Sequence, residues 1–175
     1  MIKIAITGPE STGKTSLAQD LAKEFDTLCT SEFARNYLDE INRPYEFEDI
    51  EIIAKNQRKR EDDLLLKANK ILFCDTDILV TKIWSEFVFK KCSPWINQEF
   101  EANDYNLYLL CDIDIVWEYD PQREHPHKRQ ELFDIYKNTL EAHKFPYIIV
   151  NGTGNQRTQN AIKAIQKHYS VVPSL

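Results

Sequence analysis

Short apolar runs alternate along the chain with longer segments in which apolar residues recur every three or four positions. The runs are typical of strands, and the spaced segments are typical of amphipathic helices. The runs predict five strands, over residues 2–7, 27–31, 70–75, 105–111 and 146–150. Because helical segments separate consecutive strands, we predict a three-layer α/β fold whose five-stranded parallel sheet is covered on both faces.

The helical periodicity predicts seven helices, over residues 14–25, 33–40, 47–68, 78–89, 95–102, 130–143 and 156–169. We see no internal repeat and no low-complexity segment. We therefore predict a single domain over residues 1–170 and a C-terminal tail over residues 171–175.

Two polar residues, Gln57 and Glu61, interrupt the apolar face of the long helix expected over residues 47–68. Polar groups that face a core are costly unless they find partners. In one interpretation this face lines a substrate pocket, where Gln57 hydrogen-bonds a base or a carboxamide. In the other, the helix is rotated so that both side chains reach solvent.

The charge of the chain narrows the range of partners. With 22 basic and 28 acidic residues the formal net charge is −6, which disfavours general binding of nucleic acid or of anionic membranes. No apolar run approaches the length of a membrane span, and the first residues do not resemble a signal peptide. The four cysteines lack metal-ligand spacing. We expect a cytoplasmic protein with reduced thiols and a small-molecule partner, and we leave its oligomeric state open.

Residues 8–15, GPESTGKT, match the pattern G-x-x-x-x-G-K-[ST] between a predicted strand and a predicted helix. In this pattern the loop amides and the helix N-terminus surround phosphates. The lysine bridges the β- and γ-phosphates of ATP, and the final hydroxyl ligates Mg²⁺. The predicted ATP ligands in this segment are Gly8, Pro9, Glu10, Ser11, Thr12, Gly13, Lys14, Thr15 and Ser16.

Acidic residues follow two of the predicted strands. Asp75 ends an apolar strand, where a carboxylate can hold Mg²⁺ directly or through water, whereas Asp77 is better placed to cap the next helix. Glu32 ends the second strand, from which it can orient an acceptor hydroxyl or take its proton. Arg35 lies one helical turn beyond Glu32; the alternative interpretation is a surface ion pair between them.

Residues 117–129 are polar, contain two prolines and follow the fourth strand. Kinases often supply arginines to the transferred phosphate from a segment that closes over the site. We therefore predict a lid, with Arg123 and Arg129 contacting ATP; the alternative is a solvated polar loop. The predicted catalytic residues are Lys14, Glu32, Asp75 and Arg123, with Thr15 and Asp75 as the Mg²⁺ ligands.

These motifs, in this order, resemble the ribosylnicotinamide kinase domain family of the bacterial NAD biosynthesis regulators. The resemblance covers residues 2 to about 169, and the P-loop, residues 32–35, Gln57, residues 75–77 and residues 117–129 carry it. It implies an adenylate-kinase-like P-loop fold of the AAA-like ATPase and kinase type. It also implies ATP- and Mg²⁺-dependent phosphorylation of nicotinamide riboside to nicotinamide mononucleotide.

The resemblance also implies that Gln57 lines the riboside pocket. The predicted substrate contacts are Glu32, Arg35, Gln57 and Trp84. Some relatives carry an aromatic residue before the glutamate, where this chain has Ser31. Stacking on the substrate ring would then fall to Phe33, Tyr37 or Trp84.

The regulators' helix-turn-helix and the H-x-G-H motif of their adenylyltransferase module do not occur in this sequence, so we expect neither repression nor dinucleotide synthesis from it. Two alternatives to a nicotinamide riboside kinase remain. One is a P-loop kinase of another nucleoside or of a vitamin alcohol, and the other is an ATP-binding regulatory switch without kinase activity. The switch would need no acceptor pocket.

Overall fold

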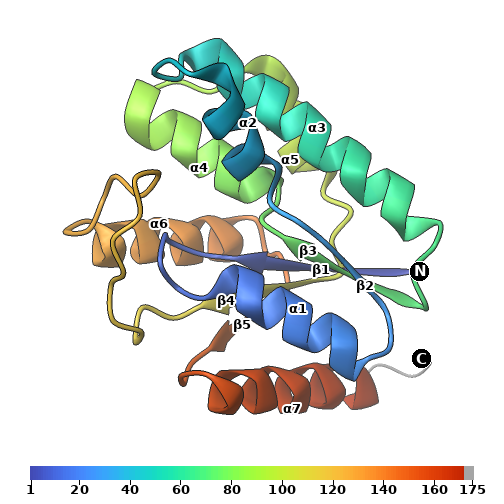
Figure 1. The fold of residues 1–175 in the computed structure, drawn as a ribbon. Helices are drawn as coiled ribbons and strands as arrows, with labels where there is room; N and C mark the ends of the chain where they lie inside the picture. Colours follow the sequence, from blue (N-terminus) through green and yellow to red (C-terminus); the bar gives the residue numbers. More distant parts are fainter. Residues whose placement is uncertain (172–175) are drawn as a thin grey trace.

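A five-stranded, wholly parallel sheet forms the centre of the molecule (Figure 1). The structure, a computed structural model, describes residues 1–171. The strand order is β2-β3-β1-β4-β5, with β1 Ile2–Thr7, β2 Leu28–Thr30, β3 Ile71–Asp75, β4 Leu107–Cys111 and β5 Tyr147–Val150. The predicted α/β fold is confirmed.

The described residues form seven helices: α1 (Lys14–Glu24), α2 (Phe33–Ile41), α3 (Phe47–Leu65), α4 (Ile78–Phe89), α5 (Pro94–Ala102), α6 (Arg129–Ala142) and α7 (Asn155–Val171). Helix α3 ends three residues earlier than predicted, because the chain turns at Leu66 toward the left-handed backbone of Lys70. Helix α7 includes Val171, and the rest of the predicted tail, residues 172–175, lies outside the described residues.

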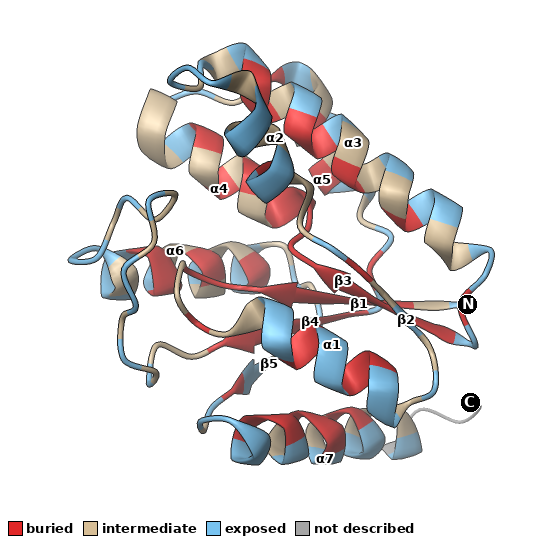
Figure 2. Cartoon of the chain, viewed as in Figure 1, coloured by how far each residue is buried: buried red, intermediate tan, exposed pale blue. Residues whose placement is uncertain are grey.

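Alternate residues of the strands point to opposite faces of the sheet and build two separate cores. On one face, Ile4 and Ile6 of β1 pack against α1 and α7. On the other face, Ala5 packs within a cluster that draws on α3, α4, α5 and α6. Figure 2 shows the largely buried strands β1, β3 and β4 between the two helical layers. Helices therefore hold the sheet in place on both faces. Polar groups can then lie at the carboxyl edge of the sheet.

Local chemistry starts the helices at this edge. Asp77 caps α4 as predicted, because its Oδ1 accepts hydrogen bonds from Leu79 N at 2.7 Å and Val80 N at 3.2 Å. Helix α3 begins with a capping box in which Glu46 and Asp49 bond each other's backbone N–H.

Gln57 and Glu61 of α3 are only 3% and 0% exposed, so the interpretation that a rotated helix carries them to solvent is wrong. The Glu61 carboxylate forms ion pairs with Lys3 at 2.8 Å and with Arg58 at 2.9 Å. Among residues 1–171, no helix has the length and apolar character needed to cross a bilayer.

Candidate active site

The loop between β1 and α1 has the backbone that the glycine pattern requires. Gly8 has φ +130°, and a Cβ there would lie 3.0 Å from the carbonyl oxygen of Cys111. Gly13 has φ +73°, and a Cβ there would lie 3.2 Å from the Ile115 side chain. Both positions therefore exclude a larger residue.

Lys14 points back into this loop, where its Nζ donates hydrogen bonds to Gly8 O at 3.0 Å and Pro9 O at 2.8 Å. The Thr12 hydroxyl also donates to Pro9 O, at 2.8 Å. Carbonyl oxygens thus hold the Lys14 ammonium group at the loop, and Gly13 precedes the N-terminus of α1, where free backbone N–H groups can bind phosphates.

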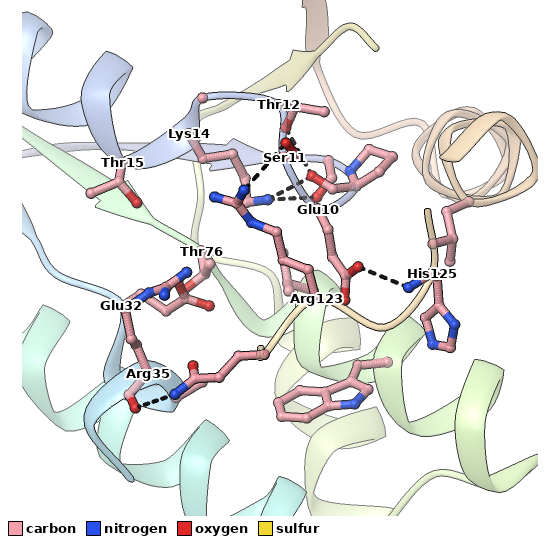
Figure 3. A pocket seen from close by; sticks show the side chains of 18 of the residues that line it. Glu10, Ser11, Thr12, Lys14, Thr15, Glu32, Arg35, Thr76, Arg123 and His125 are labelled. Carbon is pink, nitrogen blue, oxygen red and sulfur yellow. Dashed lines mark hydrogen bonds and ion pairs between the residues drawn. The ribbon is translucent and has the colours of Figure 1, made fainter. Parts of the chain in front are cut away.

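A cavity of about 520 Å³ opens at the carboxyl edge of the sheet, next to the loop (Figure 3). It brings together most of the predicted site residues: the whole segment 8–16 with Glu32, Arg35, Trp84 and Arg123. Three other predicted residues lie outside its lining. Asp75 is buried directly beneath it, Gln57 lies within helix α3, and Arg129 lies at the start of α6.

Asp75 ends β3 and is 1% exposed, yet neither of its carboxylate oxygens has a hydrogen-bond partner in the described part of the chain. Burial raises the pKa of Asp75 to about 6, while the neighbouring Thr15 hydroxyl and the Lys14 charge lower it and Glu32 raises it. Unpartnered carboxylate oxygens beside a hydroxyl and a phosphate loop are the hard ligands that Mg²⁺ prefers. The residues present therefore fit a magnesium ion held by Asp75 and Thr15.

Glu32 is the residue before α2, and its carboxylate lies 3.9 Å from Nε of Arg35. Arg35 makes a closer contact elsewhere, since its Nη1 donates to Asp120 at 2.7 Å, and its carbonyl oxygen accepts from Gln122 at 3.1 Å. Arg35 therefore ties α2 to residues 117–129, and Glu32 remains at the cavity wall with 29% of its side chain exposed.

Residues 117–129, which we call the lid, lie against the phosphate loop at two points. The Glu10 carboxylate accepts hydrogen bonds from the backbone N–H groups of Glu124 at 3.1 Å and His125 at 3.2 Å. Arg123 donates to Glu118 O at 2.6 Å and to the Ser11 hydroxyl at 3.4 Å, and Figure 3 shows it reaching across the cavity. These bonds attach the segment to the loop, while its residues stay exposed or half-buried, so contact of Arg123 and Arg129 with ATP stays a prediction.

Arg129, at the base of the lid, donates to Ile115 O at 2.8 Å and to Ser11 O at 3.0 Å. Burial and the neighbouring Arg157 charge lower the pKa of Arg129. A positive charge that is held near another cation is best compensated by an anion, and ATP phosphates would supply one.

Part of the cavity wall is aromatic, and a carboxylate lies beside it. Trp84 donates from Nε1 to the Tyr45 hydroxyl at 3.1 Å, and that hydroxyl donates to the Glu124 carboxylate at 2.6 Å. Burial and the bond to Glu124 raise the pKa of Tyr45. Of the three aromatic residues that the sequence suggested for stacking, Trp84 lines this cavity, whereas Phe33 lies under Arg60 at 4.6 Å and contacts Tyr37.

Comparison with known proteins places this geometry in a family. Residues 3–157 match the AAA domain family. The chain belongs to that family. It is 27% identical over 155 residues to the trifunctional NAD biosynthesis/regulator protein NadR of Escherichia coli K12, an alignment that covers 84% of this chain and 37% of NadR. The Salmonella typhimurium LT2 protein of the same name is 29% identical over 126 residues, or 69% of this chain and 30% of that protein. The chain thus spans about a third of the length of these curated relatives.

Solved structures agree on the fold of this AAA domain. A NadR crystal structure in complex with NR superposes with a TM-score of 0.80 at 22% identity, over 97% of this chain and 52% of that chain. Thymidylate kinase from Ehrlichia chaffeensis superposes with a TM-score of 0.69 at 16% identity, over 94% of this chain and 98% of that chain. The protein is a homologue of NadR with a P-loop kinase fold, as the sequence motifs predicted.

Sequence reasoning missed one buried cation of the AAA domain's site. Arg157, in the first turn of α7, is 3% exposed and donates to Thr12 O at 2.9 Å and Asp112 O at 3.1 Å, and it also pairs with Asp114. It lines the cavity beside the phosphate loop. No motif marks it, because it reaches the loop from 145 residues further along the chain.

Sequence reasoning also missed Tyr45, which follows Pro44 in the connection between α2 and α3. The one available signal was an aromatic residue in the short connection between two predicted helices. Its role depends on Glu124 of the lid, a contact that the sequence pattern does not reveal.

Proposed function

We propose that this protein transfers the γ-phosphoryl group of ATP to the primary ribose hydroxyl of nicotinamide riboside, forming nicotinamide mononucleotide. One observation carries the proposal: a single cavity joins the phosphate loop to an aromatic wall that has a carboxylate beside it. Nicotinamide riboside is a flat pyridinium cation, and such a ring is attracted to the face of tryptophan and to carboxylates. Trp84 and Glu124 supply both features.

The relatives support the same substrate class. The Escherichia coli relative is named as an NAD biosynthesis protein, and one structural relative was solved in complex with NR. The aromatic part of the cavity also favours a kinase over an ATP-binding switch, because a switch would not need an enclosed space beyond the phosphate loop.

In this proposal the acceptor oxygen forms a bond to the γ-phosphorus while the bond between that phosphorus and the oxygen bridging to the β-phosphate breaks, which releases ADP. Glu32 orients the acceptor hydroxyl and receives its proton. Lys14 and Arg123 stabilise the charge that develops on the transferred group. Mg²⁺, when bound by Thr15 and Asp75, would neutralise phosphate charge.

A panel of acceptors tests the proposal. ATP consumption should be measured with nicotinamide riboside, uridine, thymidine and a vitamin alcohol, with Lys14→Ala as the control for contaminating kinases. We expect nicotinamide riboside to rank first in kcat/KM. If an uncharged acceptor ranks first, the named activity is wrong although a kinase remains. If no acceptor is phosphorylated, the switch without kinase activity is favoured.

Glu32→Gln tests the acceptor role separately. The change keeps size and hydrogen-bonding capacity but removes the charge that accepts the proton. We expect phosphorylation of the riboside to fall by at least about a hundredfold, the scale of a lost general base. Isothermal titration should show unchanged affinity for a non-hydrolysable ATP analogue. Lowered affinity for that analogue would instead place Glu32 in the nucleotide site.

A further inference from the structure

Gln57 lies midway along α3, where the oxygen and both N–H groups of its side-chain amide are hydrogen-bonded. Its Oε1 accepts from Phe33 N at 2.8 Å. Its Nε2 donates to Asp75 O at 3.2 Å and to the Thr30 hydroxyl at 3.4 Å. The side chain therefore connects one helix to the ends of two adjacent strands.

These partners adjoin the two carboxylates of the proposed reaction. Phe33 directly follows Glu32, and Asp75 is itself the second of them. Thr30 completes the arrangement, because its hydroxyl also accepts from Asp75 N at 3.2 Å. One amide thus holds the backbone that precedes α2 and the backbone that ends β3 at a fixed separation.

Neither carboxylate is fixed by hydrogen bonds of its own. The Asp75 oxygens have no hydrogen-bond partner in the described residues, and Glu32 does not cap α2 with its side chain. The positions of the two carboxylates consequently depend on the backbone to which they are attached. Gln57 forms hydrogen bonds with this backbone, at Phe33 N and Asp75 O.

A direct contact between Gln57 and the substrate is disfavoured by the same geometry. Gln57 is 3% exposed and borders a void of about 20 Å³, which adjoins the main cavity at Glu32 and Trp84. To donate to a ligand, its amide would have to give up a buried hydrogen bond, which is costly.

We propose that Gln57 is a positioning residue, which sets the distance between Glu32 and Asp75 by bonding the backbone at both. The proposal replaces the expectation that Gln57 binds the riboside, and it rests on the proposed function for the roles of the two carboxylates. Displacing a catalytic group by about 1 Å can cost about a hundredfold in rate.

Gln57→Met tests the proposal, because methionine has a similar length and lacks all three hydrogen bonds. We expect kcat to fall by about tenfold to a hundredfold, with the acceptor KM within about threefold of wild type. The Mg²⁺ concentration for half-maximal activity should rise, because Asp75 is displaced. The control is Ile50→Val, which removes a fully buried methyl group from the same helix and should leave kcat and Mg²⁺ dependence unchanged.

Gln57→Glu provides a second measurement should the methionine variant fail to fold. Glutamate still accepts from Phe33 N but can donate to Asp75 O only when it is protonated. Its kcat relative to wild type should therefore rise as the pH is lowered. A ratio that stays constant with pH contradicts the proposal.

Two further results would overturn it. An acceptor KM that rises while kcat is unchanged would make Gln57 a substrate ligand. Wild-type kcat and Mg²⁺ dependence in Gln57→Met would show that Gln57 has no role in positioning the carboxylates. If the wild-type protein phosphorylates no acceptor, the proposed function fails. The positioning role of Gln57 is then tested only by the affinity of wild type and Gln57→Met for a non-hydrolysable ATP analogue at varied Mg²⁺ concentration. Unchanged Mg²⁺ dependence of that affinity in Gln57→Met would then reject positioning.

Discussion

Asp75 and Asp77 lie two residues apart and are almost equally buried, yet their surroundings give them different roles. Asp77 accepts two backbone hydrogen bonds at Oδ1 and starts α4, whereas neither oxygen of Asp75 has a partner within residues 1–171. Burial without a partner disfavours the charged form of a carboxylate. Asp75 is therefore a group that lowers stability in the absence of a ligand.

We predict that Asp75→Asn stabilises the metal-free protein at pH 8. The pKa of Asp75 is about 6 in the folded protein against 3.8 for an unperturbed aspartate, so the folded state binds the proton more tightly. Stability therefore falls as the pH rises from about 4 to about 6, and above that range the penalty is constant at about 3 kcal/mol. Chemical denaturation in EDTA should show the variant more stable at pH 8 by up to this amount, with a difference that shrinks toward pH 4.

Asp77, whose pKa burial raises to about 7, titrates in both proteins and cancels in this comparison. Asp62→Asn, at an exposed position of α3, is the control and should show no such pH-dependent gain. An Asp75→Asn protein that is less stable than wild type at pH 8 would show that an unrecognised partner holds the carboxylate.

At the scale of single residues, the sequence predicted what a local motif determines. The phosphate loop could be predicted from the sequence, because its glycines, lysine and threonine occur at fixed spacing within eight consecutive positions. Asp75 and Asp77 follow from where a strand ends and a helix begins. The partners of Gln57 could not be predicted, because they lie 18 to 27 residues away and are mostly backbone atoms.

At the scale of elements, the lid depends on contacts that its own composition does not show. Its arginines were visible in the sequence, but its attachment to Glu10 uses backbone N–H groups, which every non-proline residue carries. Arg35 adds a second attachment through Asp120. Contacts with the surrounding elements therefore hold the lid in place. The arginine side chains of the lid can then contact the nucleotide.

Arg123→Ala should lower kcat by at least about a hundredfold while the KM for ATP changes by only a few fold. Arg123 lies beside Ser11 of the phosphate loop, so its contact should strengthen as charge develops during transfer. Steady-state kinetics at saturating acceptor measures both constants. Lys128→Ala is the matched control, since it removes a positive charge from the same lid at an exposed pair with Glu131. An effect on KM alone would assign Arg123 to ground-state binding.

At the scale of the whole molecule, the carboxyl and amino edges of the sheet have different structural roles. The carboxyl edge carries the cavity, while the amino edge is held by a buried charge network. Lys3, at the start of β1, bonds Glu61 at 2.8 Å and Asp104 at 2.7 Å, and Arg58 joins the same two acids. Removing Lys3 would leave the fully buried Glu61 carboxylate with one of its two cationic partners, Arg58 at 2.9 Å.

Lys3→Met should destabilise the protein by about 3 kcal/mol, the lower end of the range for a broken buried pair. The Lys3→Met, Glu61→Leu double variant should recover part of this loss, because it removes both charges. Urea denaturation measures stability, and kcat of the folded protein at low temperature should stay at the wild-type value. A loss below about 1 kcal/mol for the single variant would mean that water reaches Glu61 in solution.

The sequence predicted the five strands, the seven helices and the edge at which the site lies, because each follows from periodicity or from parallel topology. It did not supply the strand order β2-β3-β1-β4-β5, which long-range pairing decides. The position of Arg157 depends on that order, since β4 lies beside β1 and β5 lies beside β4, which brings α7 to the phosphate loop.

The course of β1 has a practical consequence for measuring binding. This strand carries the chain from Met1, which is 65% exposed, to the phosphate loop over about 17 Å. The N-terminus thus lies across the sheet from the lid (Figure 1). A protein tethered to a sensor chip through its N-terminus would present the open cavity to flowing solution, so nucleotide and riboside association could be followed in real time without blocking either ligand's entry.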